Sequence, residues 1–201
     1  KNNLNVLANF INLKAYIPSS LNETDYINNP TKAAFTWGQS KGFEDYSKFL
    51  LGLSWQHEYN QKSKQVSSIF ANLLDSYEAR PFNILEQGTN AIGLRTRFIQ
   101  KTELWHKDFQ WTAGLEFFND LNLLKTYENL YQDYPPGTGS IQGSLLSDFK
   151  EKRSYFNLFM EAKYHLSPKF LIDFGLNLNQ TAYTLDDNFN QGSDGFSGDY
   201  R

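Results

Sequence analysis

The sequence contains no cysteine among its 201 residues. Without thiols it offers neither a disulfide framework nor a thiolate metal site. It also lacks a long apolar run, because none approaches the ~20 residues that a membrane-spanning helix needs. The mean hydropathy is low, at −0.57. Alternating strands have a low mean hydropathy even where they line a bilayer, so this value leaves a β-barrel open.

Basic residues are not in excess either, since 19 Lys and Arg stand against 22 Asp and Glu, for a net charge of −3. This balance provides no basic surface for a nucleic acid. The three histidines, His57, His106 and His165, share no metal-ligand spacing. No nucleophile-elbow motif surrounds a serine. We therefore predict no catalytic site, no metal site and no cofactor, and we do not expect an enzyme.

Aromatic residues, by contrast, are abundant at 16% of the chain, and their spacing is informative. The segment 155–179 reads YFNLFMEAKYHLSPKFLIDFGLNLN, with apolar residues on every second position before and after a Ser-Pro-Lys turn. Successive side chains of a strand point to opposite faces, and helical periodicity does not produce strict alternation. We predict three consecutive antiparallel strands within 108–119 and 151–185, with a tight turn at 167–169.

The alternation separates two faces. The apolar face is expected to carry Phe156, Leu158, Met160, Phe170, Ile172, Phe174, Trp111 and Leu115. Similar alternation at 49–59 and 92–98 predicts further strands, and 3–14 and 64–74 are also expected to be strands, although their facing is ambiguous. This makes about seven strands, several of them long enough for the 9–11 residues that cross a bilayer at a tilt. Near the strand ends, Trp55, Tyr59, Tyr164 and Tyr183 would lie at membrane interfaces.

The connections between these strands fall into two classes. Short ones are expected at 60–63, 101–107 and 167–169, and long ones at 15–45, 75–90, 120–150 and 186–201. Strict alternation of short and long places all short turns at one end of an up-and-down sheet, as in outer-membrane barrels. The predicted fold is an all-β, antiparallel transmembrane β-barrel segment. A large soluble β-sandwich with an aromatic core is the alternative, against which unstructured loops near 30 residues count.

Two stretches resemble a known family. YFNLFMEAKYHLSPKFLIDFGLNLNQTAY resembles the strand–turn–strand of TonB-dependent outer-membrane transporters, through Tyr164, Leu166, Ser167 and Lys169 and the following Gly175-Leu176-Asn177. The N-terminal run KAYIPSSLNETDYINNPTKAAFTWG is similar to transporters of this type from Bacteroidetes-like bacteria, and GLRTRF followed by AGLEFF resembles their mid-barrel hairpin. The resemblance extends over essentially the whole chain, but it concerns the barrel only.

This resemblance implies a fold and a function. Such transporters form barrels of 22 strands around an N-terminal plug. Residues 1–201 would then be about a third of one β-barrel domain, with the plug and the remaining strands absent from the chain. The family implies a receptor in the bacterial outer membrane that imports a ferric chelate, a siderophore or ferric citrate, with energy supplied by TonB through the plug. Its partners would be the chelate, the lipid bilayer and TonB.

Other functions stay open at this point. The chain is also compatible with a receptor for cobalamin or a glycan. A small self-closed barrel that acts as a passive pore, an adhesin or a structural protein is a second class. A barrel enzyme of the outer membrane, or a soluble glycan-binding sandwich, is a third.

Two sets of residues are candidates for function. In the long loops, rings and a cation that suit an anionic ferric chelate are expected at Tyr77, Arg80, Phe82, Tyr127, Tyr131 and Tyr134. On the polar face, contacts with the plug or the ligand path are expected from Arg95, Arg97, Glu161, Lys163 and Asp173. A charge that points into lipid costs ~2–4 kcal/mol near the midplane, so these side chains should point inward. The alternative for Glu161 and Asp173, a carboxylate pair that does acid–base work, is less favoured.

Overall fold

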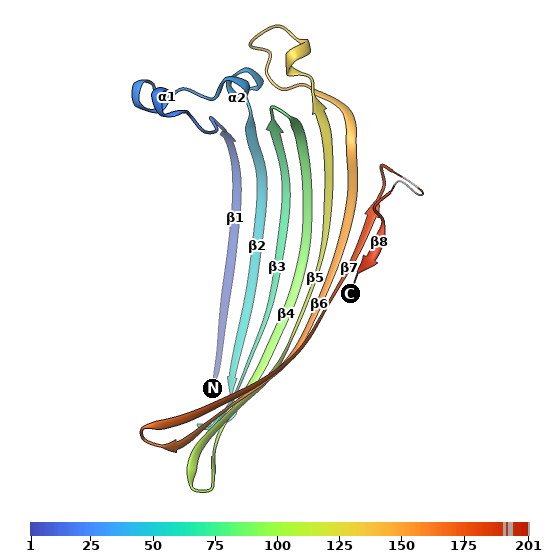
Figure 1. The fold of residues 1–201 in the computed structure, drawn as a ribbon. Helices are drawn as coiled ribbons and strands as arrows, with labels where there is room; N and C mark the ends of the chain where they lie inside the picture. The colour runs from blue at the N-terminus through green and yellow to red at the C-terminus, as the bar shows by residue number, and fades with distance from the viewer. Residues whose placement is uncertain (191, 193–194, 201) are drawn as a thin grey trace.

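Eight strands form one antiparallel sheet in a computed structural model that describes residues 1–190, 192 and 195–200 (Figure 1). Their order in the sheet, β1 to β8, is their order in the sequence. The bounds are β1 Asn2–Tyr16, β2 Phe43–Glu58, β3 Ser63–Arg80, β4 Asn83–Leu104, β5 Lys107–Asn129, β6 Gln142–Ser167, β7 Phe170–Asp187 and β8 Gly198–Tyr200. The predicted up-and-down meander is confirmed, with a short eighth strand in addition to the seven expected.

The helical elements lie at the upper end of the sheet in Figure 1. Two short helices, α1 (Glu23–Asn28) and α2 (Phe35–Ser40), belong to the β1–β2 connection, and the 3₁₀ turn η1 (Tyr131–Asp133) follows β5. The Asn22 side chain caps α1, because its Oδ1 accepts a hydrogen bond from the Asp25 N–H at 2.8 Å. No helix in the described part of the chain is long and apolar enough to cross a membrane.

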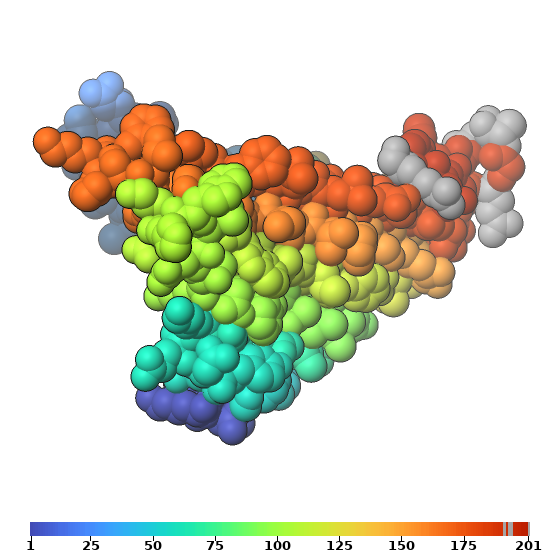
Figure 2. Space-filling model, turned by 90° about the horizontal axis from the view of Figure 1, so that it is seen from below, coloured from blue at the N-terminus to red at the C-terminus, as the bar shows by residue number. Residues whose placement is uncertain are grey.

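The predicted strand–turn–strand at the C-terminal side is also confirmed. β5, β6 and β7 are consecutive and antiparallel, and Pro168 and Lys169 form the turn between β6 and β7. A register shift between His165 and Ser167 adjusts the pairing just before this turn. Seen from below, the N-terminal end of β1 and the three lower turns follow one another in chain order (Figure 2).

The connections correct part of the prediction. The lower end carries only short turns, at 59–62, 105–106 and 168–169, as expected. At the upper end, however, the proposed loop 75–90 is strand, since β3 continues to Arg80 and β4 begins at Asn83. The proposed loop 120–150 shrinks to 130–141 for the same reason. The strict alternation of short and long connections is therefore wrong at the β3–β4 turn.

The two faces of the sheet follow from the register. One hydrogen-bonded row joins Val6, Leu53, Ile69, Leu94, Phe117 and Phe156 across β1 to β6. We call this side the apolar face. The side that carries Arg95 and Asp173 is the polar face. All eight residues predicted to share the apolar side do so, with Phe170 placed by alternation along β7.

Among the described residues, no second layer lies over the apolar face. The buried hydrophobic residues of the described chain are only Ala79, Ile84, Ala91 and Tyr131. Residues of the apolar face such as Phe10 and Leu178 remain 66% and 68% exposed. A sandwich would cover this face with a second sheet, and soluble monomers rarely leave so large an apolar patch open. The soluble β-sandwich alternative requires such a second sheet, and the described residues form a single sheet.

The apolar band crosses the strands obliquely. Its upper edge lies at Phe10 on β1 and at Leu178 on β7, each followed upward by a polar residue on the same face. The register row through Phe10 runs across the sheet to Thr184 on β7. The upper edge of the band on β7, at Leu178, lies six residues (184 − 178) below that row. The edge therefore descends by six residues over the six strand-to-strand steps from β1 to β7. With a rise of ~3.3 Å and a strand spacing of ~4.8 Å, this slope is roughly 35°. Strands in outer-membrane barrels tilt by about this angle.

Aromatic rings follow the lower edge of this band. Ring centroids lie 5.4 Å apart for Trp55 and His57, 4.4 Å for His57 and Tyr59, 5.9 Å for Tyr59 and Phe98, and 5.5 Å for Phe98 and Trp111. Tyr164 continues the girdle with Phe109, at 6.4 Å. Amphipathic rings favour a membrane–water boundary, where one side is apolar and the other wet. Tyr183 does not belong here, because it alternates onto the polar face.

Candidate functional site

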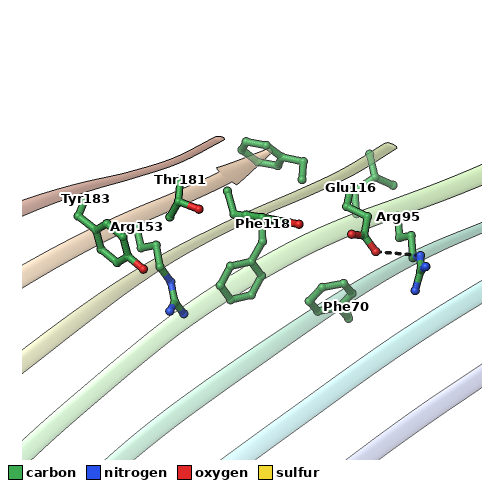
Figure 3. Close-up of a pocket in the computed structure, with 10 residues that line it drawn as sticks. Phe70, Arg95, Glu116, Phe118, Arg153, Thr181 and Tyr183 are labelled. Atoms are coloured by element: carbon green, nitrogen blue, oxygen red, sulfur yellow. Dashed lines mark ion pairs between the residues drawn. The ribbon is translucent and has the colours of Figure 1, made fainter. Parts of the chain in front are cut away.

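The polar face contains a hollow of about 490 Å³ between β3 and β7 (Figure 3). The side chains that matter for its chemistry are Phe70, Arg95, Glu116, Phe118, Arg153 and Tyr183. They come from five successive strands, and each alternates onto the polar face. The register of the sheet thus brings together residues that lie far apart in the sequence.

Two glycines allow aromatic rings to lie flat on this wall. A Cβ atom on Gly93 would overlap the ring of Phe70, and a Cβ atom on Gly114 would overlap the ring of Phe159. A glycine within a strand lets a neighbouring ring cover its backbone. Phe70 therefore lies across β4 and stacks with Phe118, with ring centroids 6.0 Å apart and an interplanar angle of 23°. The floor of the hollow is aromatic.

Two arginines flank this floor, and carboxylates of β5 hold both. Arg95 Nε lies 2.9 Å from Glu116 Oε1, and Asn157 Nδ2 donates to the other oxygen of Glu116 at 3.0 Å. Arg153 pairs with Asp120, which is only 2% exposed. The Arg153 guanidinium also lies over the Phe118 ring, 5.3 Å from its centroid. A guanidinium has five N–H donors, so each pair leaves donors for another acceptor.

The five predicted polar-face residues fall into separate places. Arg95 lines the hollow, and Arg97 follows it on the same face of β4. Nearer the lower end of the sheet, Lys163 Nζ lies 3.1 Å from Glu161 and 3.9 Å from Asp173. The register places Lys163, not Glu161, opposite Asp173, so a lysine stands between the two carboxylates. This arrangement is an ion network.

Sequence reasoning missed the charged residues Glu116 and Arg153 of the hollow, and also Asp120, which pairs with Arg153. Each is a charge at a polar-face position of a strand, and this is the signal that singled out Arg95. Their pairing depends on which residues stand opposite one another across β4, β5 and β6. Alternation predicts the face of a residue but does not predict its cross-strand partner.

The residues predicted as one ligand-binding set in the loops are distributed differently. Tyr77 and Tyr127 lie on β3 and β5, on the apolar-face side above the band, and Arg80 ends β3 on the polar-face side. Phe82 lies in the β3–β4 turn under the Arg80 guanidinium, which is 5.0 Å from the ring centroid. Only Tyr131, in η1, and Tyr134 lie in a long loop. The loop placement is therefore wrong for Tyr77, Arg80 and Tyr127, and a binding role for the set stays a prediction.

Tyr127 is tied to a carboxylate, whereas the Tyr77 hydroxyl donates to the Gln142 side chain. The Tyr127 hydroxyl donates to Glu86 Oε2 at 3.1 Å. Partial burial raises the pKa of Tyr127, and the negative charge of Glu86 raises it further. Tyr127 thus stays a protonated donor on the apolar-face side of the sheet, where its hydrogen bond joins β5 to β4.

Three upper connections meet at one point. Asn129 Nδ2 donates to the Arg80 carbonyl at 2.9 Å and to Ser140 Oγ at 2.8 Å. Ser140 Oγ in turn donates to the Ser40 carbonyl at 2.7 Å. The β1–β2 connection, the β3–β4 turn and the β5–β6 loop are therefore held together by direct hydrogen bonds over the upper end of the sheet.

The β7–β8 loop is organised by one carboxylate. The backbone N–H groups of Asn190, Phe189 and Phe196 donate to the Asp187 side chain at 2.9, 3.0 and 3.3 Å. Asp187 is only 5% exposed. The hydrogen bond from Asn190 is the main cause of a pKa that is lowered from the ordinary 3.8, with the other two amides adding to it.

We expect this loop to open in acid. A lowered pKa contributes stability that is complete above pH 3.8 and is lost as the pH falls through the folded-state value. Asp187→Asn should open the loop already at neutral pH, since an amide accepts fewer of these bonds, and should remove the pH dependence. Limited proteolysis within 188–197, from pH 7 downward, measures this. Asp186→Asn is the control, and equal cleavage of both variants at pH 7 would contradict the role of Asp187.

Comparison with known proteins supports the fold. No family model matches the sequence, and no curated protein matches it. Among solved structures, the chain is similar to the ferric citrate transporter FecA in its unliganded form, with a TM-score of 0.76 and 14% identity over 98% of this chain and 29% of that one. It is also similar to BauA, the ferric preacinetobactin receptor from Acinetobacter baumannii, with a TM-score of 0.58 and 10% identity over 79% of this chain and 27% of that one. The chain spans less than a third of either protein, and the likeness shows an antiparallel up-and-down sheet of the kind found in the barrels of outer-membrane receptors.

Proposed function

We propose that this chain is a sector of an outer-membrane β-barrel that imports a ferric chelate, with energy supplied through TonB. One observation carries the proposal, namely the opposite chemistry of the two faces of a single uncovered sheet. One face has an oblique apolar band above an aromatic girdle, and the other has arginines over an aromatic floor. A membrane wall that lines a polar lumen needs this division.

The dimensions of the band support a bilayer. On β6 the apolar face is unbroken from Phe156 to Tyr164, which is nine residues (164 − 156 + 1). A tilted strand needs about 9–11 residues to cross the hydrocarbon core. The strand itself has 26 residues and continues upward through polar positions such as Lys150 and Lys152. The strands would therefore project well beyond the outer surface of the membrane.

The polar face supports passage of an anion. Arg95, Arg97 and Arg153 point to this side, and two of them are fixed by carboxylates. The structural neighbours are described as a transporter of ferric citrate and a receptor for ferric preacinetobactin. The plug and the coupling to TonB rest on the resemblance of the sequence to TonB-dependent transporters.

The small self-closed barrel is less well supported. Closure within this chain would pair β1 with the last strand, but in the described residues β1 pairs with β2 and β8 covers only three residues of β7. Exposed N–H and C=O groups of a strand edge cannot remain unpaired in lipid. Further strands beside β1 and β7 satisfy these groups in the larger barrel that we propose.

Uptake of labelled iron tests the function. A strain that lacks the gene should take up less ⁵⁵Fe from ferric citrate or from a ferric 2,3-dihydroxybenzoate complex, and the full-length gene should restore uptake. A protonophore should abolish the restored uptake, because TonB coupling consumes the proton gradient. Uptake that persists with the protonophore would favour a passive pore. Iron uptake that does not depend on the gene would contradict the proposal and favour another ligand.

A further inference from the structure

The hollow on the polar face has the size of a small-molecule site. Its volume of about 490 Å³ lies within the ~300–1,000 Å³ typical of ligand pockets. It lies on the wall, built by strands β3 to β7, and not among the upper loops. It is therefore distinct from the tyrosines and Arg80 considered above.

The floor of the hollow selects for a flat apolar group. Phe70 is 40% exposed and stacks with Phe118 at a shallow angle, so their faces form one surface. The ring of Phe70 lies against the backbone of β4 at Gly93, where no side chain separates the two. Aromatic rings stack on such a surface in offset geometry, which an aliphatic ligand cannot do.

The sides of the hollow select for negative charge. The Arg95 and Arg153 side chains are 51% and 36% exposed, whereas the side chains of their partners Glu116 and Asp120 are 26% and 3% exposed. The cations are thus more accessible than the carboxylates that hold them. In Figure 3 the two arginines lie on opposite sides of Phe118. Within the second pair, Arg153 Nε and Asp120 Oδ1 are both buried and have no hydrogen-bond partner among the described residues, so the accessible donors of Arg153 are at the end of its guanidinium.

We propose that this hollow is a binding subsite for an anion that carries a planar aromatic ring. The ring stacks on Phe70 and Phe118, and acidic groups accept hydrogen bonds from Arg95 and Arg153. Because the arginines are already ordered by their carboxylates, little side-chain entropy is lost on binding. This inference rests on the proposed function and narrows it to a ferric chelate with an aromatic, catecholate-like ligand, in preference to ferric citrate, which has no ring.

Calorimetric titration of the purified full-length protein in detergent tests the subsite. The two probes are the ferric 2,3-dihydroxybenzoate complex and ferric citrate. We expect the wild type to bind the aromatic complex at least about tenfold more tightly. Phe118→Leu should remove most of this preference and leave the affinity for ferric citrate within about twofold. Arg95→Gln should weaken both complexes, since it removes a donor to any anion.

Lys101→Gln is the matched control, because Lys101 lies on the same face of the same strand as Arg95 and outside the hollow. It should change neither affinity, and heat-modifiable migration on gels verifies that each variant is folded. If Phe118→Leu does not fold, Phe70→Leu tests the same ring surface. Equal affinity of the wild type for both complexes, or equal losses in Arg95→Gln and Lys101→Gln, overturns the subsite and leaves the proposed function standing. If the wild type binds neither complex, the proposed function fails as well.

Discussion

Replacing Phe174 with arginine is expected to reduce folding into lipid vesicles sharply, whereas Asn177→Arg should reduce it little. Phe174 lies in the middle of the apolar band on β7 and is 59% exposed. Asn177, three positions further along the same strand, alternates onto the polar face. An arginine on the lipid face costs ~2–4 kcal/mol at the midplane, because lipid tails cannot solvate its charge.

The measurement is the denaturant midpoint of folding for the full-length protein in vesicles, read by heat-modifiable migration. Both variants introduce the same side chain into the same strand, so they differ in the face that the arginine occupies and in the residue that it replaces. Val6→Arg, within the band on β1, is a second test at the far side of the sheet. Equal midpoints for Phe174→Arg and Asn177→Arg would contradict the assignment of the two faces.

Strands and faces were predictable from the sequence wherever the two faces differ. In 155–179 one face is apolar throughout and the other is mostly polar or small, with Phe159 and Leu171 as exceptions, so the strands, the turn and the apolar side followed directly. The same reasoning failed at 75–90. There both faces carry polar residues, such as Asn83 and Glu86, so alternation is weak although the backbone ladder continues. Strand length beyond the apolar band is fixed by backbone pairing, which the side-chain pattern does not reveal.

The site was predictable only in part. Arg95 was identified because a charge on a barrel strand must face the lumen. Its partner Glu116, and the pair of Arg153 with Asp120, depend on cross-strand register. The oblique course of the apolar band likewise appears only when the strands are aligned. In a sheet of this kind the sequence predicts what each strand presents, and the register decides which residues meet.

Replacing the β5–β6 loop with a tight turn is expected to abolish high-affinity uptake and leave the barrel inserted. The Leu130 N–H donates to the Ile141 carbonyl at 2.8 Å, so these two residues already stand opposite one another. Asn-Gly in place of residues 131–140 would close them as a two-residue hairpin. The change removes Tyr131, Tyr134 and the bond from Ser140 to Ser40. The replacement is confined to the loop, because residues 122–129 belong to β5 and residues 142–148 belong to β6.

The β4–β5 turn at the lower end of the sheet provides the matched control for this loop replacement. Trp105 and His106 have positive φ angles of 51° and 60°, so Asn-Gly fits their backbone. The same dipeptide introduced there should leave uptake unchanged, since no ligand residue is predicted at that end. Loss of uptake in the loop variant alone would locate ligand capture at the upper end. If uptake and affinity survive the loop replacement, and also Arg80→Ala, then ligand capture belongs to the wall hollow, to the plug or to strands beyond this sheet.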